Sequence, residues 1–145
     1  MSIQGIAFRD AAPVYLEKWG VPSGGDWGLY RGGAIFVEGA EDITLQHNTL
    51  TRLDGNAIFI GGYDRNLTIA DNEFEFIGDS AMASWGETSG KLNANGSVVV
   101  PYAVGPDGRD GNQNRGARVV GNVARELGIW QKQSSFYFQA VAAQT

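Results

Sequence analysis

An all-β fold of short strands, stacked as successive coils, is predicted by three features of this sequence: its glycine content, an internal repeat and the alternation of apolar residues within each repeat. Of the 145 residues, 21 are Gly, about twice the usual share of roughly 7%. Because a Gly inside a helix costs about 1 kcal/mol relative to Ala, this composition favours strands and turns over a helical bundle. The hydrophobic share of 43% is enough to bury a core, and we expect one domain over residues 1–145.

The internal repeat emerges when the chain is compared with itself after a shift of about 24 residues. The matching segments are 34–37 with 57–60, 43–45 with 67–69, and 48–53 with 72–77. A third copy starts at 81–84, is interrupted by a long segment and resumes at 117–122, and a fourth starts near 134–138. Residues 3–8 look like the second half of one more copy.

Within each copy, apolar residues alternate with polar ones in short segments separated by Gly, Asp or Asn. Such alternation is typical of strands that bury one face. On the stack of strands that begins near residue 34, the residues expected to point inward are Ile35, Val37, Ile58, Ile60 and Met82, and those expected to point outward are Phe36, Glu38, Phe59, Ala83 and Trp85. One copy cannot bury that face alone, whereas copies stacked about 4.8 Å apart form a continuous core. We therefore expect a right-handed parallel β-helix with two long loop insertions, the hand following from the strong bias of parallel crossovers.

Asn48, Asn72 and Asn122 occupy equivalent turns of successive copies. Asn tolerates the left-handed conformation, and its amide can donate to and accept from the same amide one coil away. These residues are expected to form an asparagine ladder that satisfies buried polar groups. The alternative is three ordinary turn residues. The single His47 beside them is expected to be structural.

The coil pattern resembles the right-handed parallel β-helix family with the pectin-lyase-like fold. Residues 21–27, 78–81 and 132–136 look like segments of uncharacterised microbial and algal members. Since such relatives are usually longer, the resemblance implies a piece of a solenoid that is incomplete at both ends. It also implies a polysaccharide or oligosaccharide ligand, with glycoside hydrolysis or a lyase reaction if the ligand is cleaved. The alternative is a non-catalytic structural or adhesion module.

Two segments, 11–33 and 87–116, interrupt the repeat and flank the outer face of one stack of strands. A cleft between them is the default site, because function usually lies on loops held by a rigid scaffold. The aromatic side chains expected to stack on sugar rings there are Trp27, Trp85 and Phe59. The alternative is that the loops cover this face and make its aromatic residues part of the core.

Asp54, Asp79 and Glu38 are the candidate catalytic residues. Asp54 and Asp79 are 25 residues apart, nearly one coil, so we expect them one strand spacing apart. Two such carboxylates can divide into a protonated acid and an ionised partner, as glycoside hydrolysis requires. Glu38 borders the same region. The alternative is that Asp54 and Asp79 only shape turns.

A calcium site is the one cofactor that the sequence suggests, and the signal is incomplete. Asp110, Asn112 and Asn114 offer oxygen ligands at alternate positions, as calcium loops do. The Gly that such loops require comes one position late, at Gly116, and the bidentate Glu is absent. A plain loop without a cofactor is the alternative.

Charge and composition exclude several other classes. The net charge of −5 argues against nucleic-acid binding. The lack of Cys excludes disulfide and thiol chemistry, and no apolar run reaches the roughly 18 residues of a membrane span. The first residues lack the regions of a signal peptide, so no compartment is assigned, and secretion of a longer protein is an open alternative. Residues 136–145 are predicted as a strand with an uncovered edge, which favours self-association through the solenoid ends.

Overall fold

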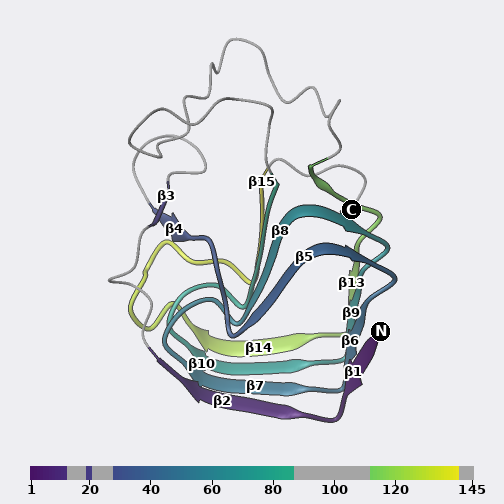
Figure 1. Cartoon of the computed structure of the whole chain (residues 1–145). Coiled ribbons are helices and arrows are strands. Elements are labelled where there is room, and N and C mark those ends of the chain that lie inside the picture. Colours follow the sequence, from purple (N-terminus) through teal and green to yellow (C-terminus); the bar gives the residue numbers. More distant parts are fainter. Residues whose placement is uncertain (13–18, 21–27, 87–111, 141–145) are drawn as a thin grey trace.

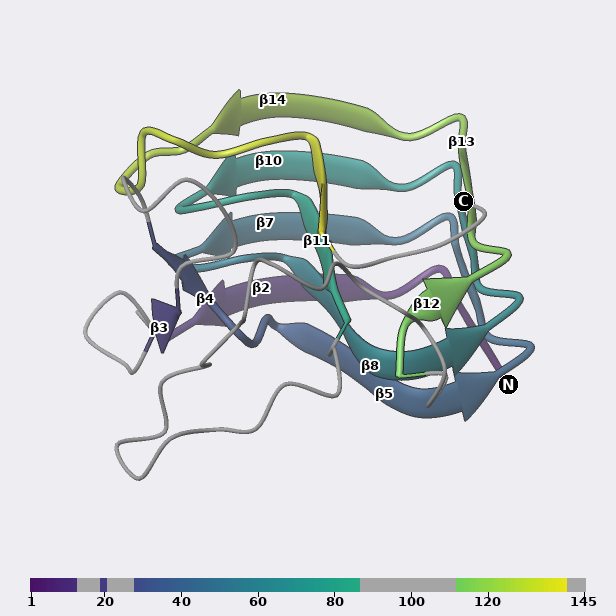
Figure 2. The same ribbon diagram turned by 90° about the horizontal axis from the view of Figure 1, so that it is seen from above.

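The computed structural model describes residues 1–12, 19–20, 28–86 and 112–140, and every regular element in these residues is a β-strand. The chain winds in successive coils, and its strands form three parallel sheets, which are called walls below (Figures 1 and 2). No helix in the described ranges is long and apolar enough to cross a membrane. The arrangement is all-β and is consistent with a parallel β-solenoid.

Each wall stacks strands from successive coils. The first wall holds β1 (Ser2–Gln4), β6 (Thr44–Gln46), β9 (Thr68–Ala70) and β13 (Arg118–Val120). The second wall holds β2 (Ala7–Ala11), β7 (Thr49–Leu53), β10 (Glu73–Ile77) and β14 (Val123–Leu127). The third wall holds β5 (Ile35–Glu41), β8 (Ile58–Arg65), β11 (Met82–Trp85), β12 (Asn114–Arg115) and β15 (Tyr137–Ala140). An antiparallel pair, β3 (Trp19–Gly20) and β4 (Leu29–Tyr30), lies within the first predicted loop.

The strand register confirms the repeat predicted from the sequence. Leu50 pairs with Phe74, and Ile58 pairs with Met82, as the self-comparison requires. The partial first copy also pairs as expected, because Ile3 lies opposite Leu45. Pairing continues in the later coils, where Phe74 lies opposite Ala124 and Met82 opposite Tyr137, and β5 pairs with β8 with one register shift between Glu38 and Ala40.

The core fills the space between the three walls. The five third-wall residues predicted to point inward all belong to this interior cluster: Ile35, Val37, Ile58, Ile60 and Met82. Leu50 and Phe74 of the second wall and Leu45 and Ile69 of the first wall meet them there. Full burial of each large apolar side chain contributes roughly 1.5–3 kcal/mol, so the stacked coils supply the hydrophobic stabilisation that one coil lacks.

The corner between the first and second walls contains three hydrogen-bonded Asn side chains. Asn48 Nδ2 donates to Asn72 Oδ1 at 3.0 Å, and Asn72 Nδ2 donates to Asn122 Oδ1 at 2.9 Å. The same amide oxygens accept the backbone N–H groups of Asn48 and Asn72, at 2.9 and 3.0 Å. Asn72 also donates to the Leu45 carbonyl at 2.9 Å. Polar groups at this buried corner therefore have partners within the stack.

The expectation that these Asn residues adopt the left-handed conformation is wrong. The positive φ angles belong to the preceding residues, His47 at 53°, Asp71 at 54° and Gly121 at 67°. The left-handed residue turns the chain at the corner, and the Asn after it then aims its side chain into the stack. His47 is exposed at this corner and shapes the backbone.

The long insertion interrupts one coil partway along its place in the third wall. β11 pairs with the first half of β8, with Trp85 opposite Gly61. β12 pairs with the second half of β8, with Asn114 opposite Asp64. The coil that begins at β11 therefore resumes its place in the third wall after the insertion.

Replacing Asn72 with Ala should lower the free energy of unfolding by about 3 kcal/mol, because several buried groups lose their partners together. Asn122 makes the same kind of contacts but is only half-buried. Water can replace part of its bonding, so Asn122→Ala should cost about 1 kcal/mol. Urea denaturation followed by circular dichroism measures both, and a loss at Asn72 no larger than that at Asn122 would contradict this account.

Candidate functional site

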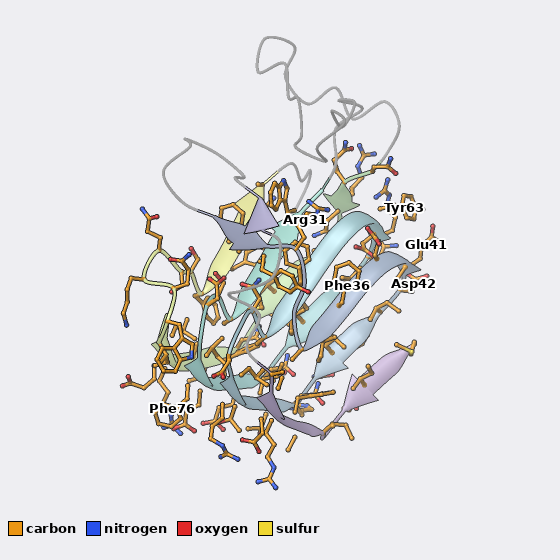
Figure 3. All side chains as sticks on the ribbon, turned by 60° about the vertical axis from the view of Figure 1, so that its left-hand side comes forward. Arg31, Phe36, Glu41, Asp42, Tyr63 and Phe76 are labelled. Atoms are coloured by element: carbon orange, nitrogen blue, oxygen red, sulfur yellow. The ribbon has the colours of Figure 1, made fainter. Side chains whose placement is uncertain are left out.

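An open groove crosses three consecutive coils where the second wall ends. Its volume is about 430 Å³. The residues that line it are Arg52, Asp54, Phe76, Gly78, Ile129 and Trp130. Arg52 lies in β7 and Phe76 in β10, and the other four belong to the turns that follow strands of the second wall. Figure 3 shows Phe76 on the outside of this wall.

Two aromatic rings of the groove are exposed to solvent. Trp130 has 57% of its surface exposed and Phe76 has 46%. The indole Nε1 of Trp130 donates to Asp54 Oδ1 at 3.2 Å, and the Trp130 backbone N–H donates to the Gly78 carbonyl at 3.0 Å. The Asp54 carboxylate thus lies beside the indole at the groove surface.

Gly78 allows this close approach. A Cβ added at Gly78 would lie 2.6 Å from the backbone carbonyl carbon of Asp54 and 2.8 Å from Cδ1 of Trp130. Both distances are shorter than side chains tolerate, so any other residue would displace the indole or the turn. The absence of a side chain at this position therefore leaves the room that the Trp130 indole occupies.

The outward direction of Phe76 comes from a feature that every coil of the second wall repeats. Asp10, Arg52, Phe76 and Glu126 occupy equivalent positions, and all have positive φ, between 50° and 61°. The flanking residues keep their pairing across this position. The left-handed residue is therefore a local bend that turns its side chain away from the core. Arg52 uses this position to bind Asp10 through two hydrogen bonds of 2.7 and 2.9 Å.

Asp54 and Asp79 differ in environment. The second-wall pairing has a spacing of 24 residues, so Asp79 is equivalent to Gly55, not to Asp54, which lies 25 residues before it. The Asp79 backbone N–H donates to the Gly55 carbonyl at 3.2 Å. Asp79 is 7% exposed and accepts a hydrogen bond from the Ser80 hydroxyl at 3.3 Å. Burial raises the pKa of the Asp79 carboxyl to about 6, although its bonds to Ser80 oppose the rise. Asp54 therefore lines the groove, whereas Asp79, which follows Gly78 in the chain, is buried.

The outer face of the third wall holds the other predicted aromatic residues. Phe59 is fully buried, and Trp85 is 7% exposed, in a cluster with Leu29 and Ala83. The Arg31 guanidinium lies 4.7 Å from the centre of the Trp85 ring and 5.7 Å from that of Phe59. Both rings are therefore packed against protein on this face.

Phe36 and Glu38 remain exposed beside this cluster. The Phe36 ring stacks on Phe59 with 5.8 Å between the ring centres. Glu38 lies over the bare backbone of Gly62, where an added Cβ would be 3.0 Å from Glu38 Oε1. Glu38 is thus on the third wall, whereas Asp54 is where the second wall ends.

The candidate calcium ligands are only partly described. Asp110 lies outside the described residues, as does the predicted sugar-stacking residue Trp27. Asn112 is half-buried, and Asn114 is buried in the third wall, where its Nδ2 donates to Ser84 Oγ at 3.3 Å. Within the described ranges, no three His, Cys, Asp or Glu side chains form a group that could hold a metal ion.

Sequence reasoning missed Phe76 and Trp130. A signal for Phe76 was present, because the equivalent residues of the neighbouring copies, Arg52 and Glu126, are charged. A Phe among charged residues on an outward position is unusual, and it suggests an exposed contact. Trp130 follows the last second-wall strand and gave no such signal, since its contact with Asp54 joins residues 76 positions apart.

Replacing Asp79 with Asn should stabilise the protein at neutral pH. The pKa of Asp79 is higher in the folded state than the ordinary value of 3.8, so ionisation of this carboxyl costs stability as the pH rises through about 6. The gain over wild type should be smallest below about pH 4 and reach roughly 3 kcal/mol above about pH 7. Urea denaturation across this pH range measures it. A constant difference between the two proteins would show that Asp79 does not titrate in this way.

None of the protein-family models, curated proteins or solved structures compared with this chain matches it. Function is therefore inferred from the geometry of the site.

Proposed function

We propose that this chain is a right-handed parallel β-helix of the pectin-lyase-like kind, and that it binds a polysaccharide in the groove beside Trp130. The observation that carries the proposal is the pair of exposed rings, Trp130 and Phe76, next to the Asp54 carboxylate. The right hand is supported by the strong bias of parallel crossovers.

The groove has the two kinds of surface that a sugar requires. Sugar rings present apolar C–H patches, which suit the faces of Trp130 and Phe76. Their hydroxyl groups need hydrogen-bond partners beside those faces. Asp54 accepts one bond from the indole, and an ionised carboxylate has capacity for about four, so it can accept from hydroxyls as well. Arg52 can donate to hydroxyl oxygens from the same groove.

The shape of the groove favours a polymer over a small molecule. Its residues come from three successive coils, which are stacked about 4.8 Å apart. An extended chain can therefore lie along the solenoid axis and contact one coil after another. Sites for small ligands usually enclose most of the ligand, whereas the aromatic rings here are open to solvent.

Cleavage of the bound polysaccharide would use Asp79 as the acid. The raised pKa of Asp79, about 6, keeps its carboxyl protonated in mildly acidic solution, which suits a proton donor to a glycosidic oxygen. Asp79 follows Gly78, a groove residue, directly in the chain. Because Asp79 is buried, the reaction would require a local opening of the turn, with Asp54 as the surface carboxylate. Activity lost in Asp79→Asn with binding retained is the expected signature.

A non-catalytic assembly module is the second candidate, favoured by the apolar surface of the last described coil. Val120, Val123 and Phe136 are 40%, 62% and 41% exposed, respectively. The strand edges of β14 and β15 lie at this same end of the stack (Figure 2). Among the described residues no further strand pairs with these edges, and an apolar surface beside such an edge favours pairing with another chain.

Trp130→Ala should weaken the binding of the recognised glycan at least 10-fold, because a stacking contact worth about 1.5 kcal/mol is lost. Phe76→Ala should act in the same direction. Phe36→Ala is the matched control, since Phe36 is also an exposed ring but lies on the third wall. Affinity electrophoresis with a panel of plant and algal polysaccharides identifies the ligand, and titration calorimetry measures the loss. The groove is the wrong site if Phe36→Ala weakens binding and Trp130→Ala does not.

Self-association through the solenoid end should increase with concentration and decrease in Val123→Lys, which places a charge on that surface. Sedimentation velocity over a wide concentration range measures both. Thr51→Lys, on a half-buried second-wall position away from this end, is the control. A wild-type protein that stays monomeric at high concentration would contradict the assembly candidate and leave glycan binding in place.

A further inference from the structure

The third wall carries polar side chains in the interior where the neighbouring coil has an apolar one. Ala40, Asp64 and Asn114 occupy the same stack position in three successive coils. Ala40 packs against the core cluster, whereas Asp64 and Asn114 are buried polar residues. The change from Ala to Asp and Asn comes where the long insertion returns to the wall. A polar pair at an otherwise apolar position is the kind of local conflict that marks functional sites.

Three buried atoms in this region have no hydrogen-bond partner. They are Asp64 Oδ2, Asn114 Oδ1 and the Tyr137 hydroxyl oxygen. By strict geometry the Tyr137 hydroxyl has no partner, yet it is near enough to the Ser84 and Asn114 side chains to interact with both, and these interactions offset part of the rise that burial causes in its pKa. Ser84 also belongs to the group, because its Oγ accepts a hydrogen bond from Asn114 Nδ2 at 3.3 Å. An additional group would stabilise this cluster, because a buried polar atom left without a partner is destabilising.

The chemistry of the unpaired atoms points to a positive group. Asp64 and Asn114 lie opposite each other in the third wall, and their unpaired oxygens are acceptors only, so a proton donor or a cation between them would be favourable. The other oxygen of Asp64 already accepts the Ala40 backbone N–H, at 3.0 Å. Glu38 and Arg65 act on the Asp64 carboxyl with opposite signs. Arg65 Nη1 donates to the backbone carbonyls of Asp64 and Gln113, at 2.8 and 2.6 Å, and Asp64 Oδ2 has no partner in hydrogen-bond geometry. All the available ligand atoms are oxygens, and oxygen ligands favour hard cations such as Ca²⁺, Mg²⁺ or Na⁺.

We propose that Asp64, Asn114, Tyr137 and Ser84 form an interior site for a hard cation at the base of the long insertion. Ser84 precedes the insertion and Asn114 follows it, so an ion bound to both ends closes the gap in the third wall. Asp64 supplies the charged ligand from the coil below, and Tyr137 supplies a hydroxyl from the coil above. The ion therefore joins three coils and both ends of the insertion. This site is independent of the proposed glycan groove, which lies at the end of the second wall.

Thermal unfolding tests the site. The purified chain is first treated with a chelator and dialysed, and its melting temperature is then measured with CaCl₂, MgCl₂, NaCl or KCl added separately at equal ionic strength. We expect one of these cations to raise the melting temperature in a saturable way. Asp64→Ala should abolish the rise, and the neighbouring coil already carries Ala at this position, so the variant fits the wall. The control variant Asp71→Asn removes an exposed carboxylate from the corner between the first and second walls, and it should keep the full rise in melting temperature.

Tyr137→Phe provides a second variant that keeps the fold. It removes a buried hydroxyl that is near Ser84 and Asn114 but in hydrogen-bond geometry with neither, so stability without added cation should change little. Cation affinity is measured by adding the cation to the Tb³⁺-loaded protein and following the loss of terbium luminescence. The affinity should fall about 10-fold, a loss of roughly 1.4 kcal/mol. The proposal is overturned if no cation stabilises the wild type, in which case a turned Asn114 amide or a bound water closes the cluster. It is also overturned if Asp64→Ala keeps the response, because the ion then binds elsewhere.

Discussion

Hydrogen bonding between consecutive coils is the constraint on which the rest of this structure depends. The parallel pairing places Leu50 opposite Phe74 and Ile58 opposite Met82, and the shift between β5 and β8 at Glu38 to Ala40 is a local irregularity. A slip of one residue would turn the buried side chains of a whole strand to the outside. The Asn side chains at the corner between the first and second walls also favour this register, because Asn72 binds an Asn in the coil on each side of it. The polar corner and the apolar core thus specify one register.

A fixed register also decides where variation is tolerated. The long insertion separates β11 from β12, yet both strands pair with β8, so the coil is interrupted without a change in stacking. Outward positions are free to carry other side chains, and the left-handed bend of the second wall presents Arg52 and Phe76 to solvent. Function can therefore change at the surface while the interior spacing stays constant, which is a general property of repeat proteins.

Much of this fold was predictable because its information is local and periodic. The alternation within 57–60 and the shift to 34–37 gave the correct inward residues and the correct pairing. The three equivalent Asn positions were also visible as spacing alone, and only the left-handed residue was placed one position late. Periodicity indicates which residues stack, and backbone geometry at the corner decides which of them takes the positive φ.

The candidate sites could be predicted only in part, because exposure depends on what distant segments cover. The sequence by itself determined the all-β repeat, its register and the division of the third wall into inward and outward residues. The tertiary structure decided that Phe59 and Trp85 are packed beneath neighbours, and that Trp130 reaches Asp54 across 76 residues. It also brought Asp64 beside Asn114 across the long insertion. The physical reason is that strand periodicity follows from neighbouring residues, whereas burial and contact between side chains follow from the packing of the whole stack.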